Sequence, residues 1–330
     1  MPFKEITSYR PLRWLRNGHS NTMASFLYRQ GVDDPFYQRT RIDTPDQDFL
    51  DLDFAQVGSH NLIIVLHGLE GSSGSGYIKT MVRAIHHKGW DALVVNMRGC
   101  SGEPNRTYSS YHSGKSDDLD TVVKYVLENY HYHRIGILGF SLGGNITLRY
   151  MGEQRTQVPE PIKGGVAISV PCDLGSTAIR LSDWDNIVYL KRFLKDLKAK
   201  AYEKKKNFPD APFTIEEIES VKSFKDFDDL YTGSAHGFGD AQGYWDNCSS
   251  TYVVDQIERP TLLINAWDDP FLTPECFPRE AAENNPDFFF NQTKYGGHVG
   301  FSNQGLGDSW HEAQALYFLE EQFRKSLKVR

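Results

Sequence analysis

The sequence predicts an α/β fold with a mostly parallel central sheet flanked by helices. Short apolar runs alternate with helical patterns along most of the 330 residues, as expected of consecutive βαβ units. Three runs, 61–67, 90–96 and 134–140, are almost continuously apolar, which is typical of strands that helices cover on both faces. Hydrophobic residues make up 39% of the chain and aromatic residues 13%, which is ample for a packed core.

The expected strands follow in chain order. The segment 49–56 alternates apolar and polar residues, which favours an antiparallel edge strand with one face in solvent. The other strands are expected at 61–67, 90–96, 134–140, 162–170, 260–267 and 287–293. In the last of these, the aromatic run 288–290 is expected to lie in the core.

Helical patterns fall between the strands. The segment 76–88 places four apolar residues on one face, and Gly89 follows as a stop signal. The segment 117–129 repeats this periodicity, and a last helix is expected from about 309 to 326.

The stretch 177–250 carries helical, Lys-rich and aromatic sequence without a convincing buried strand. Regular α/β connections are short, so we expect one domain over 1–330 with a helical cap insertion at 177–250. A cap would lie over the carboxyl edge of the sheet, where ligands bind in such folds. We expect its apolar face to line an acyl pocket with Trp184, Tyr189, Phe193, Tyr244 and Trp245.

Charge and cysteine content exclude several protein classes. The chain has 36 Lys and Arg against 43 Asp and Glu, a net charge of −7, so we expect no nucleic-acid partner. No stretch approaches the roughly 18 apolar residues of a membrane span, and the first 20 residues lack the apolar core of a signal peptide. The four cysteines are scattered. The sequence therefore predicts a cytoplasmic protein with reduced thiols and no integral membrane segment.

The motif Gly139-Phe140-Ser141-Leu142-Gly143 lies between an apolar strand and a helical pattern. A GxSxG motif in this setting predicts a nucleophile elbow, in which a tight strand-to-helix turn exposes the serine. The two glycines lack the Cβ atoms that would clash in such a turn. We therefore predict Ser141 as a nucleophile, against the alternative of an ordinary glycine-rich turn.

An elbow serine needs an acid and then a histidine further along the chain. Asp268 and Asp269 end the strand at 260–267, and His298 follows the strand at 287–293 after two glycines. These positions lie at the same sheet edge as Ser141. Adjacent residues that leave a strand point in opposite directions, and Asp269 stands directly before Pro270, so we predict Asp269 as the acid. His311, in the last helix, is a weaker alternative base.

The loop 67–71 (HGLEG) follows the first buried strand. In an elbow enzyme this loop and the residue after the nucleophile each supply one backbone N–H to an oxyanion hole. We therefore predict the amides of Leu69 and Leu142 as the oxyanion donors. His131 and His133 have no further ligands at metal-binding spacing, so we predict no metal and no cofactor.

With these residues in view, the chain resembles the YheT-like branch of the α/β-hydrolase superfamily (the AB hydrolase 4 family). This branch is related to plant embryogenesis-associated hydrolases and animal membrane lipases. The resemblance implies a serine esterase with Ser141, Asp269 and His298 as its triad, and it agrees that the second Asp of the DDP motif is the acid. It covers nearly the whole chain and rests on the segments 14–19 (WLRNGH), 67–73 (HGLEGSS), 96–102 (NMRGCSG), 139–145 (GFSLGGN), 227–232 (FDDLYT), 268–271 (DDPF) and 296–301 (GGHVGF).

These observations predict a serine esterase or lipase-type hydrolase that cleaves carboxylic esters of small molecules or lipids through an acyl-enzyme on Ser141. An acyltransferase with the same triad is one alternative, since water and another alcohol differ only as acceptor. A non-catalytic binding protein of the same fold is another. The Lys-rich run 191–206 is expected to be a solvated helix face rather than a lipid contact, and Trp14 to His19 to brace the N-terminal segment.

Overall fold

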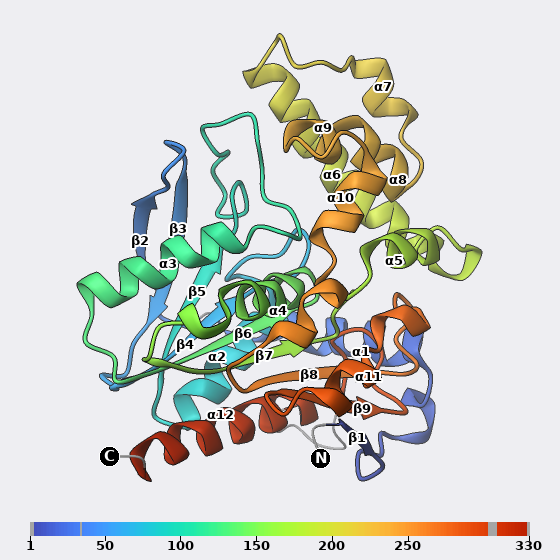
Figure 1. Cartoon of the computed structure of the whole chain (residues 1–330). Helices are drawn as coiled ribbons and strands as arrows, with labels where there is room; N and C mark the ends of the chain where they lie inside the picture. The colour runs from blue at the N-terminus through green and yellow to red at the C-terminus, as the bar shows by residue number, and fades with distance from the viewer. Residues whose placement is uncertain (1–2, 34, 303–308, 329–330) are drawn as a thin grey trace.

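The computed structural model describes residues 3–33, 35–302 and 309–328 and contains one mixed sheet (Figure 1). The strand order is β1-β9-β8-β7-β6-β4-β5-β3-β2, and all pairs are parallel except those that β3 makes with β2 and β5. The mostly parallel α/β sheet predicted from the sequence is thus confirmed. Its strands are β1 (Phe3–Ile6), β2 (Gln38–Asp43), β3 (Phe49–Ala55), β4 (Asn61–Leu66), β5 (Asp91–Asn96), β6 (Arg134–Phe140), β7 (Ile162–Ile168), β8 (Thr261–Ala266) and β9 (Phe288–Thr293).

Helices cover both faces of this sheet, so successive residues of a central strand are buried in two different cores (Figure 1). Ile64 of β4 packs in the core beneath the helices at 116–129 and 142–154, whereas Ile63 and Val65 pack in the core beneath those at 76–87 and 310–328. This two-sided burial explains the continuous apolar runs. The helices outside the 177–250 stretch are α1 (Gly18–Tyr28), α2 (Gly76–His87), α3 (Ser116–Asn129), α4 (Leu142–Gln154), α11 (Arg279–Asn284) and α12 (Trp310–Lys328).

The connection between β7 and β8 holds a group of helices with a hydrophobic cluster of its own. These helices lie together beyond the sheet, on the side of its β6, β7 and β8 strands (Figure 1). They are α5 (Leu174–Arg180), α6 (Ile187–Asn207), α7 (Ile215–Ser220), α8 (Phe224–Phe227), the π-helical turn Asp228–Thr232, α9 (Gly233–Ala235) and α10 (Ala241–Cys248). Within the described residues, no helix is long and apolar enough to cross a membrane.

The prediction of an edge strand at 49–56 is wrong in part. β3 is antiparallel, but β2 covers its outer side and all seven of its residues are buried. Its polar residues point to two arginines rather than to water: Arg41 contacts Asp51 at 2.8 Å, and Arg39 contacts Asp53 at 2.7 Å. A buried carboxylate is tolerated where such a partner is present. The polar residues of the alternating pattern therefore form ion pairs with β2 and do not face solvent.

Candidate active site

Ser141 stands on the turn between β6 and α4 in a strained backbone conformation. Its φ is 52° and its ψ is −118°, a region that a residue with a side chain seldom adopts. A Cβ atom on Gly139 would lie 2.1 Å from the carbonyl oxygen of Gly143, and one on Gly143 would lie 2.4 Å from that of His67. The two glycines of the motif are therefore required by close backbone approach.

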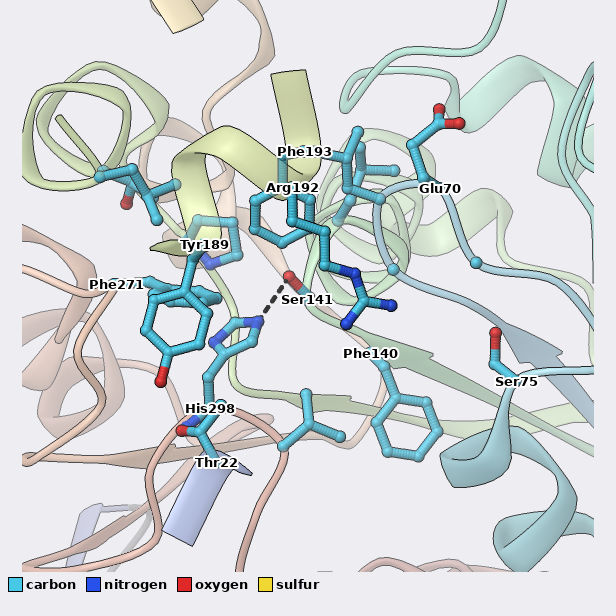
Figure 2. A pocket seen from close by; sticks show the side chains of 18 of the residues that line it. Thr22, Glu70, Ser75, Phe140, Ser141, Tyr189, Arg192, Phe193, Phe271 and His298 are labelled. Atoms are coloured by element: carbon cyan, nitrogen blue, oxygen red, sulfur yellow. Dashed lines mark hydrogen bonds between the residues drawn. The ribbon is translucent and has the colours of Figure 1, made fainter. Parts of the chain in front are cut away.

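Ser141, His298 and Asp269 lie in one chain of hydrogen bonds. The Nε2 atom of His298 is 3.0 Å from the Oγ of Ser141 (Figure 2). Its Nδ1 atom is 2.8 Å from the Oδ2 of Asp269. The Asp269 side chain has no solvent exposure, and its Oδ1 accepts the backbone N–H of Phe271. With Nδ1–H donated to the carboxylate, Nε2 is free to accept the serine proton.

Asp268, the neighbouring carboxylate, points elsewhere. Its Oδ1 accepts the backbone N–H of Gly297 at 2.9 Å, and its Oδ2 is buried with no hydrogen-bond partner among the described residues. Burial first, and then the nearby charge of Asp269, raise the pKa of Asp268 to about 6. His311 is buried between the rings of Phe140 and Phe301, and its ring nitrogens bond to no described group.

The start of α1 holds the histidine loop. The Oγ1 of Thr22 accepts the backbone N–H of His298 at 2.8 Å and donates to the carbonyl of Gly18. Gly18 lies so close to Asp268 that a Cβ atom there would fall 1.7 Å from its carbonyl oxygen. Sequence reasoning missed Thr22, because nothing in its spacing links it to a loop far along the chain. The segment 14–19 leads directly into this contact.

The loop after β4 lies against Ser141, since a Cβ atom on Gly68 would be 3.2 Å from the serine Cβ. The amides on either side of Leu69 are already bonded, that of Gly68 to the hydroxyl of Tyr77 and that of Glu70 to the hydroxyl of Tyr111. Neither Leu69 nor Leu142 donates its own amide to any residue that the structure describes. Both amides are available to a ligand.

His67 fixes the shape of the same loop. Its Nε2 accepts the backbone N–H of Met97 at 3.1 Å, and its Nδ1 lies 2.7 Å from the carbonyl oxygen of Gly68. Burial lowers the pKa of His67 to about 4, so the ring is neutral and can accept with one nitrogen and donate with the other. From the sequence, His67 was expected in this loop, but no role was assigned to it.

A cavity of about 620 Å³ opens onto Ser141. Its walls combine the elbow and the loop at 68–71 with apolar side chains from the helices between β7 and β8 (Figure 2). Of the five aromatic residues expected to line an acyl pocket, Tyr189, Phe193, Tyr244 and Trp245 do line it. Trp184 does not: it is 88% exposed, because it precedes α6 in a 3-10 turn (Trp184–Asn186) on the surface.

Two lysines of the run 191–206 turn inward. The ammonium of Lys200 lies 3.0 Å from the Glu70 carboxylate, and that of Lys204 lies 2.6 Å from the Oδ1 of Asn105. The expectation of a solvated helix face is therefore wrong for these two lysines, which reach back to polar groups of the loops below, whereas Lys191, Lys195 and Lys206 are exposed. Within the part of the chain that the structure describes, no three His, Cys, Asp or Glu residues cluster as metal ligands would.

Comparison with known proteins identifies the family of the chain. The profile of the alpha/beta hydrolase fold family matches residues 61–303. The chain is 34% identical to YheT of Escherichia coli strain K12, a protein named as an esterase, over 91% of this chain and 88% of that protein. It is 28% identical to a monoacylglycerol lipase of Saccharomyces cerevisiae, over 84% and 62% of the two chains.

The solved structure of an esterase of Pyrococcus furiosus has the same fold, with a TM-score of 0.58 at 22% identity over 87% of this chain and 91% of that one. The resemblance seen in the sequence motifs is thus confirmed. The chain belongs to the α/β-hydrolase family, in its branch of YheT-like esterases.

Proposed function

We propose that this protein is a serine hydrolase of carboxylic esters, with Ser141 as nucleophile, His298 as general base and Asp269 as the acid that orients it. The observation that carries the proposal is the Ser141 Oγ at 3.0 Å from His298 Nε2, on a strained turn that lines a cavity. Strain of this kind clusters at functional sites. The relatives named as esterase and lipase support ester substrates.

The proposed reaction proceeds in two transfers. Ser141 Oγ attacks the ester carbonyl while His298 takes its proton, and the amides of Leu69 and Leu142 hold the developing oxyanion. The C–O bond of the ester then breaks, His298 gives the proton to the departing alcohol, and the acyl group remains on Ser141. Water, activated by the same imidazole, attacks the acyl-enzyme and releases the carboxylic acid.

We further propose that residues 177–250 act as a cap whose apolar side chains receive the acyl group. Support comes from Tyr189, Phe193, Tyr244 and Trp245, which line the same cavity as Ser141. Within that cavity Asp228 accepts the indole N–H of Trp245 at 2.9 Å, and burial raises its pKa to about 7. A wall of this composition favours an aliphatic chain over a charged group.

Replacing Ser141 with alanine tests the proposal. We expect the Ser141→Ala variant to lose ester hydrolysis and labelling by a fluorophosphonate, because the labelled oxygen is absent. Circular dichroism should show that the variant remains folded. Ser75→Ala, which removes another hydroxyl of the same cavity, should still be labelled. Hydrolysis that persists in folded Ser141→Ala would refute the assignment of the nucleophile.

A further inference from the structure

The mouth of the active-site cavity is bordered by apolar side chains that are exposed to solvent. Met23 and Phe26 of α1 and Val188 of α6 all line the cavity, yet they are 42%, 40% and 68% exposed. Side chains that line the cavity and are also exposed to solvent lie at the rim of its opening. The opening therefore lies between α1 and the first turn of α6.

Three more large apolar residues, close to these in the sequence, are exposed to solvent. Leu27 of α1 is 60% exposed, and Trp184, one turn before Val188, is 88% exposed. Ile187, beside them at the start of α6, is 40% exposed. Single exposed apolar residues are ordinary on a protein surface, but a group of them around a cavity marks a binding surface.

Two contacts join α1 to α6 beside the opening. The guanidinium of Arg192 lies 4.4 Å above the ring of Phe26. At the other end of the helix pair, the ring of His19 stacks on Tyr189, with centroids 5.7 Å apart, and its Nε2 lies 3.5 Å from the Asp185 carboxylate.

The charges on α6 beside the rim are mostly positive, whereas Asp183 and Asp185, on either side of Trp184, are paired with Arg180. Lys191, Arg192 and Lys195 are exposed on α6, and none of them forms an ion pair with a described residue. The stretch 191–196 contains one carboxylate, Asp196. Basic side chains next to exposed apolar ones are the composition that binds the surface of an anionic lipid layer.

We propose that this surface, the mouth rim formed by Met23, Phe26, Leu27, Trp184, Ile187 and Val188, docks on lipid that contains anionic phospholipid. The acyl chain of an ester would then pass from the lipid into the cavity without crossing water. This inference rests on the proposed hydrolase function, because it concerns how that site receives its substrate. Trp184, which does not line the cavity, would lie at the lipid–water interface, where the amphipathic ring of a tryptophan is favoured.

Vesicle flotation tests docking without turnover. The Ser141→Ala chain is mixed with vesicles of phosphatidylcholine and phosphatidylglycerol, or of phosphatidylcholine alone, and the bound fraction is measured. We expect binding to the mixed vesicles that weakens with added salt. Leu27→Asp/Trp184→Asp in the same background should bind on the order of tenfold more weakly, because it places charge where apolar side chains enter the lipid.

Tyr252→Asp/Tyr317→Asp is the matched control, since these rings are 55% and 58% exposed but line no part of the cavity. It should bind as the parent does. With Ser141 intact, Leu27→Asp/Trp184→Asp should keep hydrolysis of a water-soluble ester and lose hydrolysis of an ester held in the mixed vesicles.

Three results would overturn the inference: no binding by the parent chain, equal losses in the rim and control variants, or a rim variant that changes the oligomeric state and not vesicle binding. Absence of esterase activity would count against the proposed function instead, because flotation needs no turnover.

Discussion

At the scale of single residues, the adjacent carboxylates Asp268 and Asp269 have opposite surroundings. Asp269 is fully enclosed and bonded to both His298 and the backbone N–H of Phe271. Asp268 has one oxygen bonded to Gly297 and the other buried without a described partner. Their contributions to activity and to stability should therefore separate.

We predict that Asp269→Asn lowers kcat by several orders of magnitude. An amide at this position would favour the wrong imidazole tautomer and could not stabilise the imidazolium, a change that costs about 10⁴ in the serine-protease triad. Steady-state hydrolysis of a p-nitrophenyl ester measures the effect. Asp268→Asn, its control, should retain kcat within a fewfold range. An inactive Asp268→Asn beside an active Asp269→Asn would move the acid to Asp268.

The Asp268→Asn variant should also change how the free energy of unfolding depends on pH. Burial raises the pKa of Asp268 to about 6 in the folded protein, above its value in the unfolded chain. The folded state therefore keeps this proton up to a higher pH than the unfolded chain does. As pH rises from about 4 to about 6, the free energy of unfolding falls by up to about 1.4 kcal/mol per pH unit. Asp268→Asn should remove this slope in denaturant melts.

The sequence allowed residues to be placed near one another where each of them follows the end of a strand. Ser141, Asp269 and His298 each follow a buried strand, and parallel strands end at one sheet edge, so order and position placed them together. That they act as a triad stays a proposal. Thr22 and Tyr111 had no such signal, because their contacts to the site join segments that are remote in the sequence.

At the scale of elements, α6 touches the loop that carries the Leu69 amide. Glu70 follows Leu69 with a φ of 54°, a left-handed conformation that is unfavourable for a residue with a side chain. Its backbone N–H is bonded to Tyr111, and its carboxylate accepts both the Tyr111 hydroxyl at 2.5 Å and the Lys200 ammonium. Three contacts thus hold the strained residue next to the proposed oxyanion donor.

We predict that Lys200→Met lowers kcat about tenfold to a hundredfold with little change in KM, since full loss of one oxyanion donor costs about 10²–10³. The inhibition constant of a boronic acid, which forms a tetrahedral adduct, should weaken in parallel with kcat/KM. Lys200→Arg should recover part of both. Lys198→Met on the same helix loses only a bond to the carbonyl of Glu219 and should match the parent. Equal kinetics in the two methionine variants would contradict the contact's role.

Elements proved easier to place in the centre of the sheet than at its margins. β1 and β2 were missed because their sequences, FKEI and QRTRID, carry few apolar residues and lie at the two edges. The role of β3 was misjudged for the related reason that its buried face is closed by ion pairs. Hydrophobic periodicity indicates which residues contact other apolar groups, but it does not indicate which polar residues are buried in ion pairs.

At the scale of the whole molecule, the proposed triad and the wall of the cavity come from different parts of the chain. The hydrogen-bonded Ser141, Asp269 and His298 stand on loops after β6, β8 and β9, whereas much of the cavity wall comes from helices between β7 and β8. Because those helices pack around a hydrophobic cluster of their own, their sequence can vary without displacing the proposed triad. Acyl specificity should therefore follow the helices and not the elbow.

The last prediction concerns chain length. For p-nitrophenyl esters of increasing length, kcat/KM should rise about fourfold per methylene, which corresponds to about 0.8 kcal/mol of burial, until the cavity of about 620 Å³ is filled. Ala178 of α5 lines this cavity and is 8% exposed. Ala178→Phe should move the preferred ester to shorter chains and leave acetate hydrolysis unchanged. A profile that falls steadily from acetate in the parent, or one that Ala178→Phe leaves unaltered, would show that the acyl group lies outside this cavity.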